Sequence, residues 1–203
     1  MRVLPIKYEE TKDWLLNVHY LKRMPVISYA FGLFEDSDCL GIVTFGLPAS
    51  PSLCKGICGD EWSSKVIELN RMCFREQVKN GNSYLISQAM KFIPKPMIVV
   101  SYADTKFGHL GKVYQASNFM YTGITKERTD GSPKEEGSHS RHGVDYTKRV
   151  DRSAKHRYVF ISASKSDRKK ILNALNYKVQ PYPQGTPSRY DINHKPITQG
   201  TLL

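Results

Sequence analysis

The segment that most constrains the fold is an apolar run in the middle of the chain, Met97–Ala103. Pro94 and Pro96 precede it and Asp104 follows it, so its length suits a strand better than a helix. A strand of this composition is normally buried on both faces of its sheet, which places helices on both sides. The run therefore predicts an α/β protein built around a central strand.

Helices and strands are predicted to alternate around this central strand. Apolar residues at helical spacing predict helices over residues 9–23, 83–93, 109–117 and 165–175. β-branched and aromatic stretches predict strands over residues 27–34, 40–47, 66–74, 118–122, 158–162 and 177–180. Residues 48–62 are predicted to form a loop, because glycines and prolines interrupt them. The order predicts one mixed central sheet, antiparallel in its front half and flanked by helices.

A single domain over residues 1–203 is expected, since a chain of 203 residues with 40% hydrophobic content suffices for one compact core. Residues 124–156 have no sustained period and are rich in glycine, serine and charge. They are predicted to form a long basic excursion from the core, and structureless segments of more than about 15 residues are usually functional or disordered. The tail from about residue 181 is predicted to be irregular.

Positive charge is concentrated late in the chain. The protein has 30 Lys and Arg against 19 Asp and Glu, a formal net charge of +11, and between Lys148 and Lys170 nine basic residues accompany two acidic ones. Such a cluster releases counterions when it meets a phosphate backbone, which is the usual source of nonspecific affinity for nucleic acid. The alternative is a solvated basic face. The residues predicted to bind DNA are Lys148, Arg149, Arg152, Lys155 and Arg157.

Other features favour a protein inside the cell. No stretch approaches the roughly 18 consecutive apolar residues that a membrane span needs, and the first residues lack the charged and apolar regions of a signal peptide. The 4 cysteines are too few for a disulfide framework in a chain of this length, so reduced thiols are expected. A membrane is not an expected partner.

Asp104 is the strongest single candidate for a functional residue. It lies just beyond the carboxyl end of the central strand, where open sheets bind their ligands. Ser101, Tyr102, His109 and Tyr114 add hydroxyl and imidazole groups on the strand and the following helix. The alternative is that Asp104 only caps the turn after the strand.

Arg71 is the second candidate. In the strand over residues 66–74, simple alternation places it on the face of Ile67, Leu69 and Cys73. A guanidinium on an apolar face needs a carboxylate, a carbonyl or an anionic ligand, because an unpaired buried charge costs several kcal/mol. A structural pair of Arg71 with a carboxylate is the alternative, and the spacing does not separate the two.

His19 and Tyr20, near the end of the first predicted helix, are the next candidates. Imidazole and phenol groups serve as hydrogen-bond partners, bases or metal ligands. The alternative for His19 is a cation that caps the carboxyl end of the helix.

These candidates fall within sequence runs that resemble the signature of Mom proteins, a family of bacteriophage DNA-modification proteins. The specific central part comprises Ser101-Tyr102-Ala103-Asp104, Gly108-His109-Leu110-Gly111, Val113-Tyr114-Gln115-Ala116-Ser117-Asn118-Phe119 and Tyr121-Thr122-Gly123. Flanking support comes from His19-Tyr20, Glu68-Leu69-Asn70-Arg71, Arg157-Tyr158-Val159 and Pro181-Tyr182-Pro183. Together these runs span most of the predicted core, from about residue 14 to 183.

The resemblance implies a GNAT-like fold, the architecture of many acyltransferases, and carbamoylmethylation of adenine in phage DNA, which shields the genome from host restriction enzymes. It also implies a bound iron, for which the matching ligands are His19, Tyr20, Asp104 and Tyr114. With Arg71, these residues form the expected catalytic set. Arg71, Ser101 and Tyr102 are expected to bind the cofactor or donor.

One departure from GNAT enzymes leaves the donor open. Those enzymes usually hold the pyrophosphate of coenzyme A with closely spaced glycines between the central strand and its helix, whereas residues 75–83 contain only Gly81. Acetyl transfer would also join adenine through a carbonyl carbon, while the expected product is joined through a methylene carbon. The donor is therefore either acetyl-coenzyme A followed by a further step, or another activated two-carbon unit.

The sequence thus predicts an enzyme of the infected host's cytoplasm that acts on double-stranded DNA with the target adenine flipped out of the duplex. Two other classes stay open: an N-acetyltransferase of a protein or small molecule, and a noncatalytic DNA-binding protein that counters host defence. A homodimer is also open, since the sequence does not fix the oligomeric state.

Overall fold

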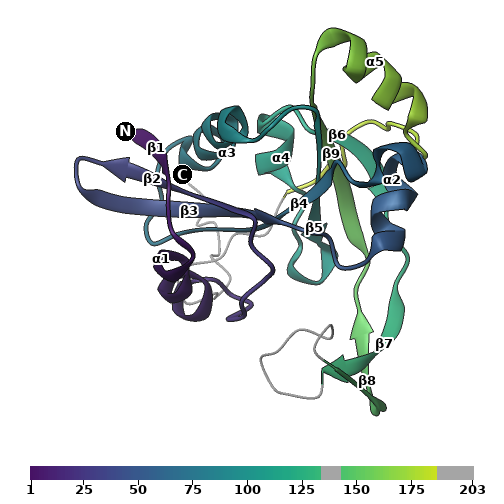
Figure 1. The fold of residues 1–203 in the computed structure, drawn as a ribbon. Helices are drawn as coiled ribbons and strands as arrows, with labels where there is room; N and C mark the ends of the chain where they lie inside the picture. The colour runs from purple at the N-terminus through teal and green to yellow at the C-terminus, as the bar shows by residue number, and fades with distance from the viewer. Residues whose placement is uncertain (134–142, 187–203) are drawn as a thin grey trace, which may run out of the picture.

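A computed structural model describes residues 1–133 and 143–186. A seven-stranded mixed sheet forms the centre of the molecule, and a separate two-stranded ribbon extends from one end of it (Figure 1). The order across the large sheet is β1-β2-β3-β4-β5-β9-β6. Its strands are β1 (Arg2–Pro5), β2 (Tyr29–Glu35), β3 (Asp38–Gly46), β4 (Val66–Phe74), β5 (Met97–Asp104), β6 (Met120–Ile124) and β9 (Lys155–Ser162). The ribbon pairs β7 (Arg128–Pro133) with β8 (Val144–Arg152).

Helices cover both faces of the large sheet, which confirms the predicted α/β class with a mixed sheet. The helices are α1 (Tyr8–Asp13), the π-helical turn η1 (Trp14–Val18), α2 (Pro51–Ser63), α3 (Gly81–Phe92), the 3₁₀ turn η2 (Thr105–Phe107), α4 (Lys112–Ala116) and α5 (Lys165–Ala174). α3 and α4 pack on one face, over the core that contains Leu85, Val99 and Phe119. α2 and α5 pack on the other face, over Ile98 and Val100. No helix of the described residues is long and apolar enough to cross a membrane.

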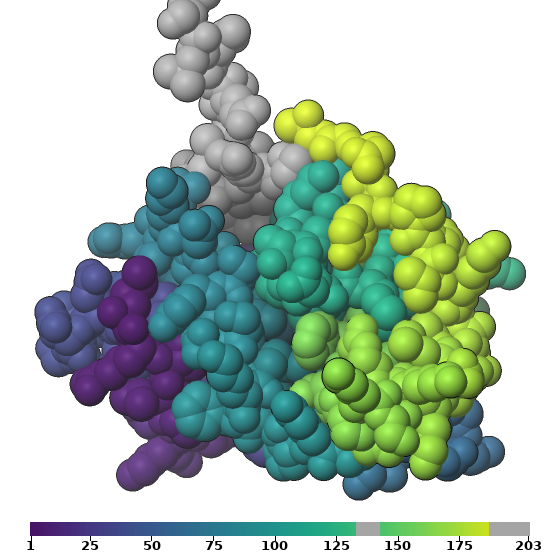
Figure 2. Space-filling model, turned by 90° about the horizontal axis from the view of Figure 1, so that it is seen from above, coloured from purple at the N-terminus to yellow at the C-terminus, as the bar shows by residue number. Residues whose placement is uncertain are grey.

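The two edges of the sheet lie on opposite sides of the molecule. In Figure 2 the N-terminal strands (purple) appear on one side, and the helix and segment near residues 165–186 (green to yellow) on the other. Teal residues near the middle of the chain lie between them. The central strand β5 has paired strands on both sides, β4 and β9, which agrees with its buried residues.

β4 and β5 are parallel, and they pair only where both begin. Val66, Ile67 and Glu68 face Ile98, Val99 and Val100, and no further pairs follow. β4 turns toward β3 for the rest of its length, whereas β5 pairs with β9 throughout. Because the strands separate after Glu68, the sheet is split at its centre, on the side where β5 ends at Asp104.

A β-bulge in β4 changes which way its side chains point. Leu69 pairs with Phe45 and Arg71 with Thr44, so Asn70 is the extra residue. Met72 and Phe74 consequently pack in the same core as Leu69, and Cys73 packs in a separate cluster with Trp14 and Ile42. The simple alternation predicted from the sequence is wrong beyond Asn70, since Arg71 no longer shares a face with Leu69.

The first helix ends earlier than predicted. It runs to Val18 through the π-helical turn, whose last hydrogen bond joins the His19 amide to the Trp14 carbonyl at 2.8 Å. His19 then adopts extended backbone angles, and the chain crosses the face of β4. Asn70 holds this crossing segment by donating its side-chain amide to the Val26 carbonyl at 2.8 Å.

Residues 51–63 form a helix where a loop was predicted. Ser50 caps α2 by accepting from the Leu53 amide at 3.3 Å, and Pro51 occupies the first helical position. These two signals outweigh the glycines, although the helix is kinked at Cys58 and Gly59. The prediction of a loop is therefore wrong.

Two other predictions need correction at the C-terminal side. The excursion over residues 124–156 is in large part an antiparallel ribbon, with residues 134–142 outside the described part. The strand predicted over residues 177–180 is absent, although the Gln180 amide donates to the Tyr121 carbonyl of β6 at 2.9 Å. Of the tail, residues 181–186 contain no helix or strand, and residues 187–203 lie outside the described part.

Gly111 generates a prediction about how α4 docks on the sheet. Its φ is +67°, and a Cβ would lie 2.4 Å from the Cε2 atom of the fully buried Tyr158. We expect Gly111→Ala to lower the free energy of unfolding by about 3 kcal/mol, from left-handed backbone strain and overpacking together. Gly56→Ala, in α2, is the control: a Cβ there meets only the Tyr177 hydroxyl at 3.3 Å, so the change should be within about 1 kcal/mol. Urea denaturation measures both, and equal losses would contradict the packing argument.

Candidate active site

The split between β4 and β5 is lined by hydroxyl groups at its inner end. Ser101 is 1% exposed and donates its Oγ proton to the Leu69 carbonyl at 2.9 Å, which satisfies a backbone acceptor where strand pairing has stopped. The Tyr114 side chain, on α4, hydrogen-bonds to Ser101. Burial raises the pKa of Tyr114. The structure therefore brings two of the predicted residues together across the split.

Tyr20 occupies the centre of the site. Its ring stacks on His19 with centroids 4.5 Å apart and meets Phe107 edge-on at 4.9 Å. Burial raises the pKa of Tyr20 to about 12; the nearby Tyr114 and Asp104 raise it further, while Arg71 and Arg23 oppose the rise. The phenol is therefore a hydrogen-bond donor at neutral pH and lies close to the other predicted residues.

His19 is the C-cap residue of η1. Its ring does not act as a protonated capping imidazole, which would donate hydrogen bonds from both nitrogens. Its Nδ1 atom accepts from the Leu21 amide at 3.1 Å, so this nitrogen carries no proton. The expectation of a positively charged His19 at the helix end is therefore not supported by the geometry. Its stacking on Tyr20 places the imidazole in the site.

Two arginine side chains lie near enough to Tyr20 to affect its pKa. Arg71 is 8% exposed, and Arg23, on the segment after η1, is half-buried. The Nε atoms of both are buried and have no hydrogen-bond partner among the described residues. Burial lowers the pKa of Arg71 and the positive charge of Arg23 lowers it further, so the two guanidinium groups act on each other as like charges.

The positive charges of Arg71 and Arg23 are only partly balanced by nearby groups. Arg71 donates to the Asn70 carbonyl at 2.6 Å, and the charge of Glu68 stabilises both guanidinium groups. The ion pairs formed among the described residues include neither Arg71 nor Arg23. Burial and the charge of Arg152, from the base of the ribbon, lower the pKa of Arg23. The structural Arg71–carboxylate pair, left open by the sequence, is absent from the described part of the chain.

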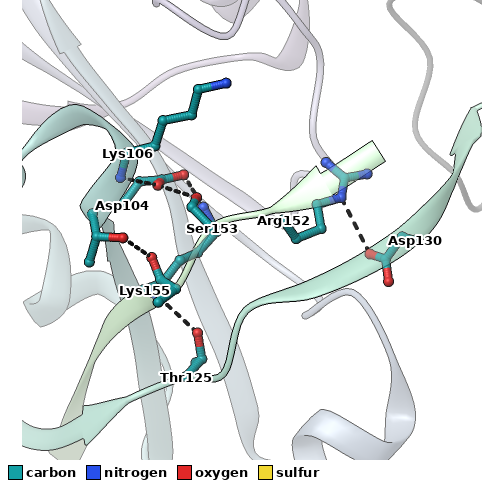
Figure 3. A network of polar contacts seen from close by, with 9 residues as sticks. Asp104, Lys106, Thr125, Asp130, Arg152, Ser153 and Lys155 are labelled. Atoms are coloured by element: carbon teal, nitrogen blue, oxygen red, sulfur yellow. Dashed lines mark hydrogen bonds and ion pairs between the residues drawn. The ribbon is translucent and has the colours of Figure 1, made fainter. Parts of the chain in front are cut away.

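Asp104 is held by three donors at the end of β5. It accepts from Ser153 Oγ at 2.5 Å, from the Lys106 amide at 3.0 Å and from the Lys155 ammonium group (Figure 3). Burial alone raises the pKa of Asp104, but the bonds from Lys155, Ser153 and Lys106 prevail and lower it. The sequence left two roles open for Asp104, a residue of the functional site and a cap of the turn after the strand. Asp104 lies near Tyr20, and it also caps the turn η2.

Tyr102 lies on the other side of β5 from Ser101. It packs against the core of Ile98 and Val100, and burial raises its pKa. The predicted donor-binding pair of Ser101 and Tyr102 is therefore not brought together on one face of the sheet.

The predicted DNA-binding residues occupy three different environments. Lys148 and Arg149 are exposed on β8. Arg152 pairs with Asp130 across the ribbon, with nitrogen and oxygen 3.3 Å apart, and Lys155 is bonded to Asp104 (Figure 3). Arg157 is 8% exposed and donates to Thr122 at 3.0 and 2.8 Å, so its guanidinium is engaged inside the fold.

The residues predicted to hold iron do not fit a preformed metal site. Both oxygens of Asp104 already accept hydrogen bonds, one of them from a cation. No group of three or more His, Cys, Asp or Glu side chains among the described residues is arranged to hold a metal ion. We therefore derive no chemical step through iron.

Comparison with known proteins identifies the family. Residues 1–184 match the model of the Mom protein family. The chain belongs to the Mom family. A relative from Escherichia phage Mu, named methylcarbamoylase mom, is 30% identical over 202 residues, which cover 88% of this chain and 84% of the relative. The resemblance inferred from the sequence runs is thus confirmed.

Solved structures of acetyltransferases are also similar to this Mom protein. A GNAT-family acetyltransferase from Bacillus cereus is 13% identical with a TM-score of 0.46, covering 80% of this chain and 98% of its own. An acetyltransferase from Bacillus subtilis, solved in complex with CoA, is 12% identical with a TM-score of 0.47, covering 79% and 98%. Likenesses this low carry no argument about substrate or donor.

Arg23 is the functional candidate of this Mom protein that the sequence did not reveal. The predicted helix continued through it, which would have placed it on a solvated helical face. Because the helix ends at Val18, the following segment instead carries Arg23 across β4 to Arg71. No periodicity in the sequence marks such a crossing.

The buried Nε–H group of Arg71, which has no hydrogen-bond partner among the described residues, generates a test of the role of this residue. If it is kept for a ligand, Arg71→Met should raise the free energy of unfolding by about 1 kcal/mol, because an apolar side chain of similar length removes an incompletely paired buried charge. Arg75→Met is the control, since Arg75 pairs with Asp13 at the surface and its loss should cost less than about 1 kcal/mol. Urea denaturation measures both. A loss of several kcal/mol in Arg71→Met would show that Arg71 is a structural residue.

Asp104 generates a prediction about pH. Asp104→Asn should lower the free energy of unfolding at neutral pH by about 2 kcal/mol, since each hydrogen bond to a charged group contributes about 1.5–3 kcal/mol. The folded-state pKa is depressed, so the contribution of the carboxylate is complete above its ordinary pKa and is lost as the pH falls through the folded value. The difference from wild type should therefore shrink toward about pH 3. Asp60→Asn, whose pair with Lys55 is exposed, should change stability by less than about 1 kcal/mol. A loss for Asp104→Asn that is the same at both pH values would contradict the assignment.

Proposed function

We propose that this chain is a transferase that attaches a carbamoylmethyl group to the exocyclic amine of adenine in phage DNA, and that the modification protects the DNA from host restriction enzymes. Membership of the Mom family and the methylcarbamoylase name of the phage Mu relative support the kind of reaction. The observation that carries the site is the pair of buried Nε–H groups of Arg23 and Arg71 that have no partner among the described residues, on two side chains that influence each other and Tyr20 electrostatically.

The arginine pair suits a donor with an anionic or carbonyl oxygen. Two buried Nε–H groups without partners cost about 1–3 kcal/mol each, and an oxygen acceptor placed between them would remove that cost. Arg71 lies deep and Arg23 nearer the surface, so the donor would enter from the side of the segment after η1. Tyr20 and Tyr114, both protonated at neutral pH, would donate further hydrogen bonds to it.

The transfer itself is a substitution at a methylene carbon. The exocyclic nitrogen of adenine forms a bond to that carbon, the leaving group departs with its electron pair, and the nitrogen loses a proton. Asp104 is an unfavourable base for this proton, because its carboxylate has a lowered pKa and already accepts three hydrogen bonds. We assign Asp104 to positioning Lys155 and the start of β9. His19 is also unsuited to accept this proton, because its Nδ1 atom already accepts from the Leu21 amide and its Nε2 atom therefore carries the hydrogen. The proton would leave with the departing group or pass to water.

The adenine would reach the site only after leaving the duplex, because its amine is otherwise paired. The exposed side chains of Lys148 and Arg149 on the ribbon are suited to contact phosphates of the flanking DNA. The reaction would take place in the cytoplasm of the infected bacterium, where the phage DNA lies. The donor is an activated two-carbon unit, for which acetyl-coenzyme A is one candidate.

The proposal is tested by mass spectrometry of nucleosides from bacteria that express the chain. Deoxyadenosine heavier by one carbamoylmethyl group is expected with the wild type and not with Arg71→Met, because that variant loses the donor site. The phage Mu relative, expressed in the same strain, verifies that the host supplies the donor. Unmodified deoxyadenosine from abundant, folded wild-type protein in that strain would overturn the proposal. Acetylated proteins in its place would indicate an N-acetyltransferase.

A further inference from the structure

A positively charged groove opens on the outer side of β6, separate from the split between β4 and β5. It has a volume of about 740 Å³ and lies between the end of β6 and the chain segment over residues 176–180. Exposed side chains of Lys126, Arg128 and Lys178 line it, with the buried Arg157 at its wall. No acidic residue is among those that line it. Arg128 pairs with Asp130, with nitrogen and oxygen 3.2 Å apart, whereas Lys126 and Lys178 take part in none of the ion pairs found among the described residues. The groove therefore carries positive charge at these two lysines that its own walls do not neutralise.

The walls of the groove are fixed by the fold. The Gln180 amide donates to the Tyr121 carbonyl at 2.9 Å, which attaches the segment over residues 176–180 to β6. Arg157 donates to Thr122, and its guanidinium lies 3.2 Å from the centroid of the Tyr177 ring. These contacts join β6, β9 and the segment, so the groove is formed before any ligand arrives.

The groove begins at the same end of the sheet as the candidate active site. Asp104 of β5 pairs with Lys155 of β9, and the Lys155 amide donates to Thr125, which lines the groove, at 2.9 Å. Two strand spacings separate β5 from β6, a distance of about 10 Å. The ribbon leaves the sheet between these two places (Figure 1). A polymer that extends from the site to the groove would therefore pass the base of the ribbon.

From this arrangement we propose that the groove binds the phosphate backbone of the DNA strand that carries the target adenine. The proposal rests on the proposed function for the identity of the polymer. The exposed lysines Lys126 and Lys178, which form no ion pair among the described residues, match the repeated charge of a nucleic-acid backbone. The side chains of Asn176 and Gln180 add donors for phosphate or sugar oxygens. The groove is open to solvent, which suits an extended strand rather than an enclosed small molecule.

The test is the binding of a fluorescently labelled DNA duplex to the full chain, measured by anisotropy over a series of salt concentrations. We expect Lys126→Glu/Lys178→Glu to weaken binding at least about tenfold and to reduce the salt slope by about two, because each phosphate contact contributes about 0.9 to that slope. Lys65→Glu/Lys91→Glu is the control: it makes the same change of charge on exposed residues near the end of the sheet where β4 and β5 begin. It should weaken binding by less than about threefold, since exposed charges beyond about 10 Å are largely screened.

Equal effects of the two double variants would overturn the groove as a DNA site, and so would a wild type that does not bind DNA at low salt. Circular dichroism verifies that each variant is folded, and Lys126→Ala/Lys178→Ala repeats the test if charge reversal prevents folding. Mass spectrometry of nucleosides separates this proposal from the proposed function. Groove-dependent DNA binding without any modified adenine would overturn the proposed function alone. If a groove variant binds DNA as well as wild type and still modifies adenine, only the proposal that the groove binds DNA would be overturned.

Discussion

The separation of two parallel strands is the constraint on which the rest of the site depends. Beyond Glu68 and Val100, β4 and β5 no longer pair, and each must satisfy its backbone in another way. β5 keeps β9 as its partner, β4 keeps β3, and Ser101 supplies a side-chain donor to the Leu69 carbonyl. Ser101 at this opening is also hydrogen-bonded to the side chain of Tyr114 from α4.

The charged residues of the site differ in how completely they are compensated. Asp104 accepts from three donors, and its negative charge is matched by Lys155, so its contacts already account for its burial. Arg71 and Arg23 repel each other and retain buried Nε–H groups without partners in the described part of the chain. A protein gains nothing in stability from such a pair, and evolution tolerates it where function requires it. The contrast separates Asp104, whose contacts are complete, from Arg71 and Arg23, each of which keeps a buried hydrogen-bond donor without a partner in the described part of the chain.

The sequence predicted those features that depend on local pattern. The central strand, the hairpin of β2 and β3 and the apolar stripe of α3 each have a period that persists over several residues, and each was found. Asp104 was chosen as a candidate because open sheets bind their ligands just beyond the carboxyl ends of their strands. The bulge at Asn70 was not predictable, since it depends on the register of β3 against β4. Arg23 was missed for a related reason: the π-helical turn that ends the first helix is closed by the His19 amide and has no composition signature.

The hydrogen bonds of Asp104 also connect the site to the parts of the molecule that face outward. Ser153 and Lys155 flank the junction where β8 ends and β9 begins, so their bonds to Asp104 fix the base of the ribbon against the end of β5 (Figure 3). Arg152, one residue before that junction, is close enough to influence Arg23. Thr125, one residue beyond β6, is bonded to the backbone of Lys155. Asp104 therefore fixes, through Ser153 and Lys155, the junction beside which Arg152 of the ribbon and Thr125 of the groove both lie.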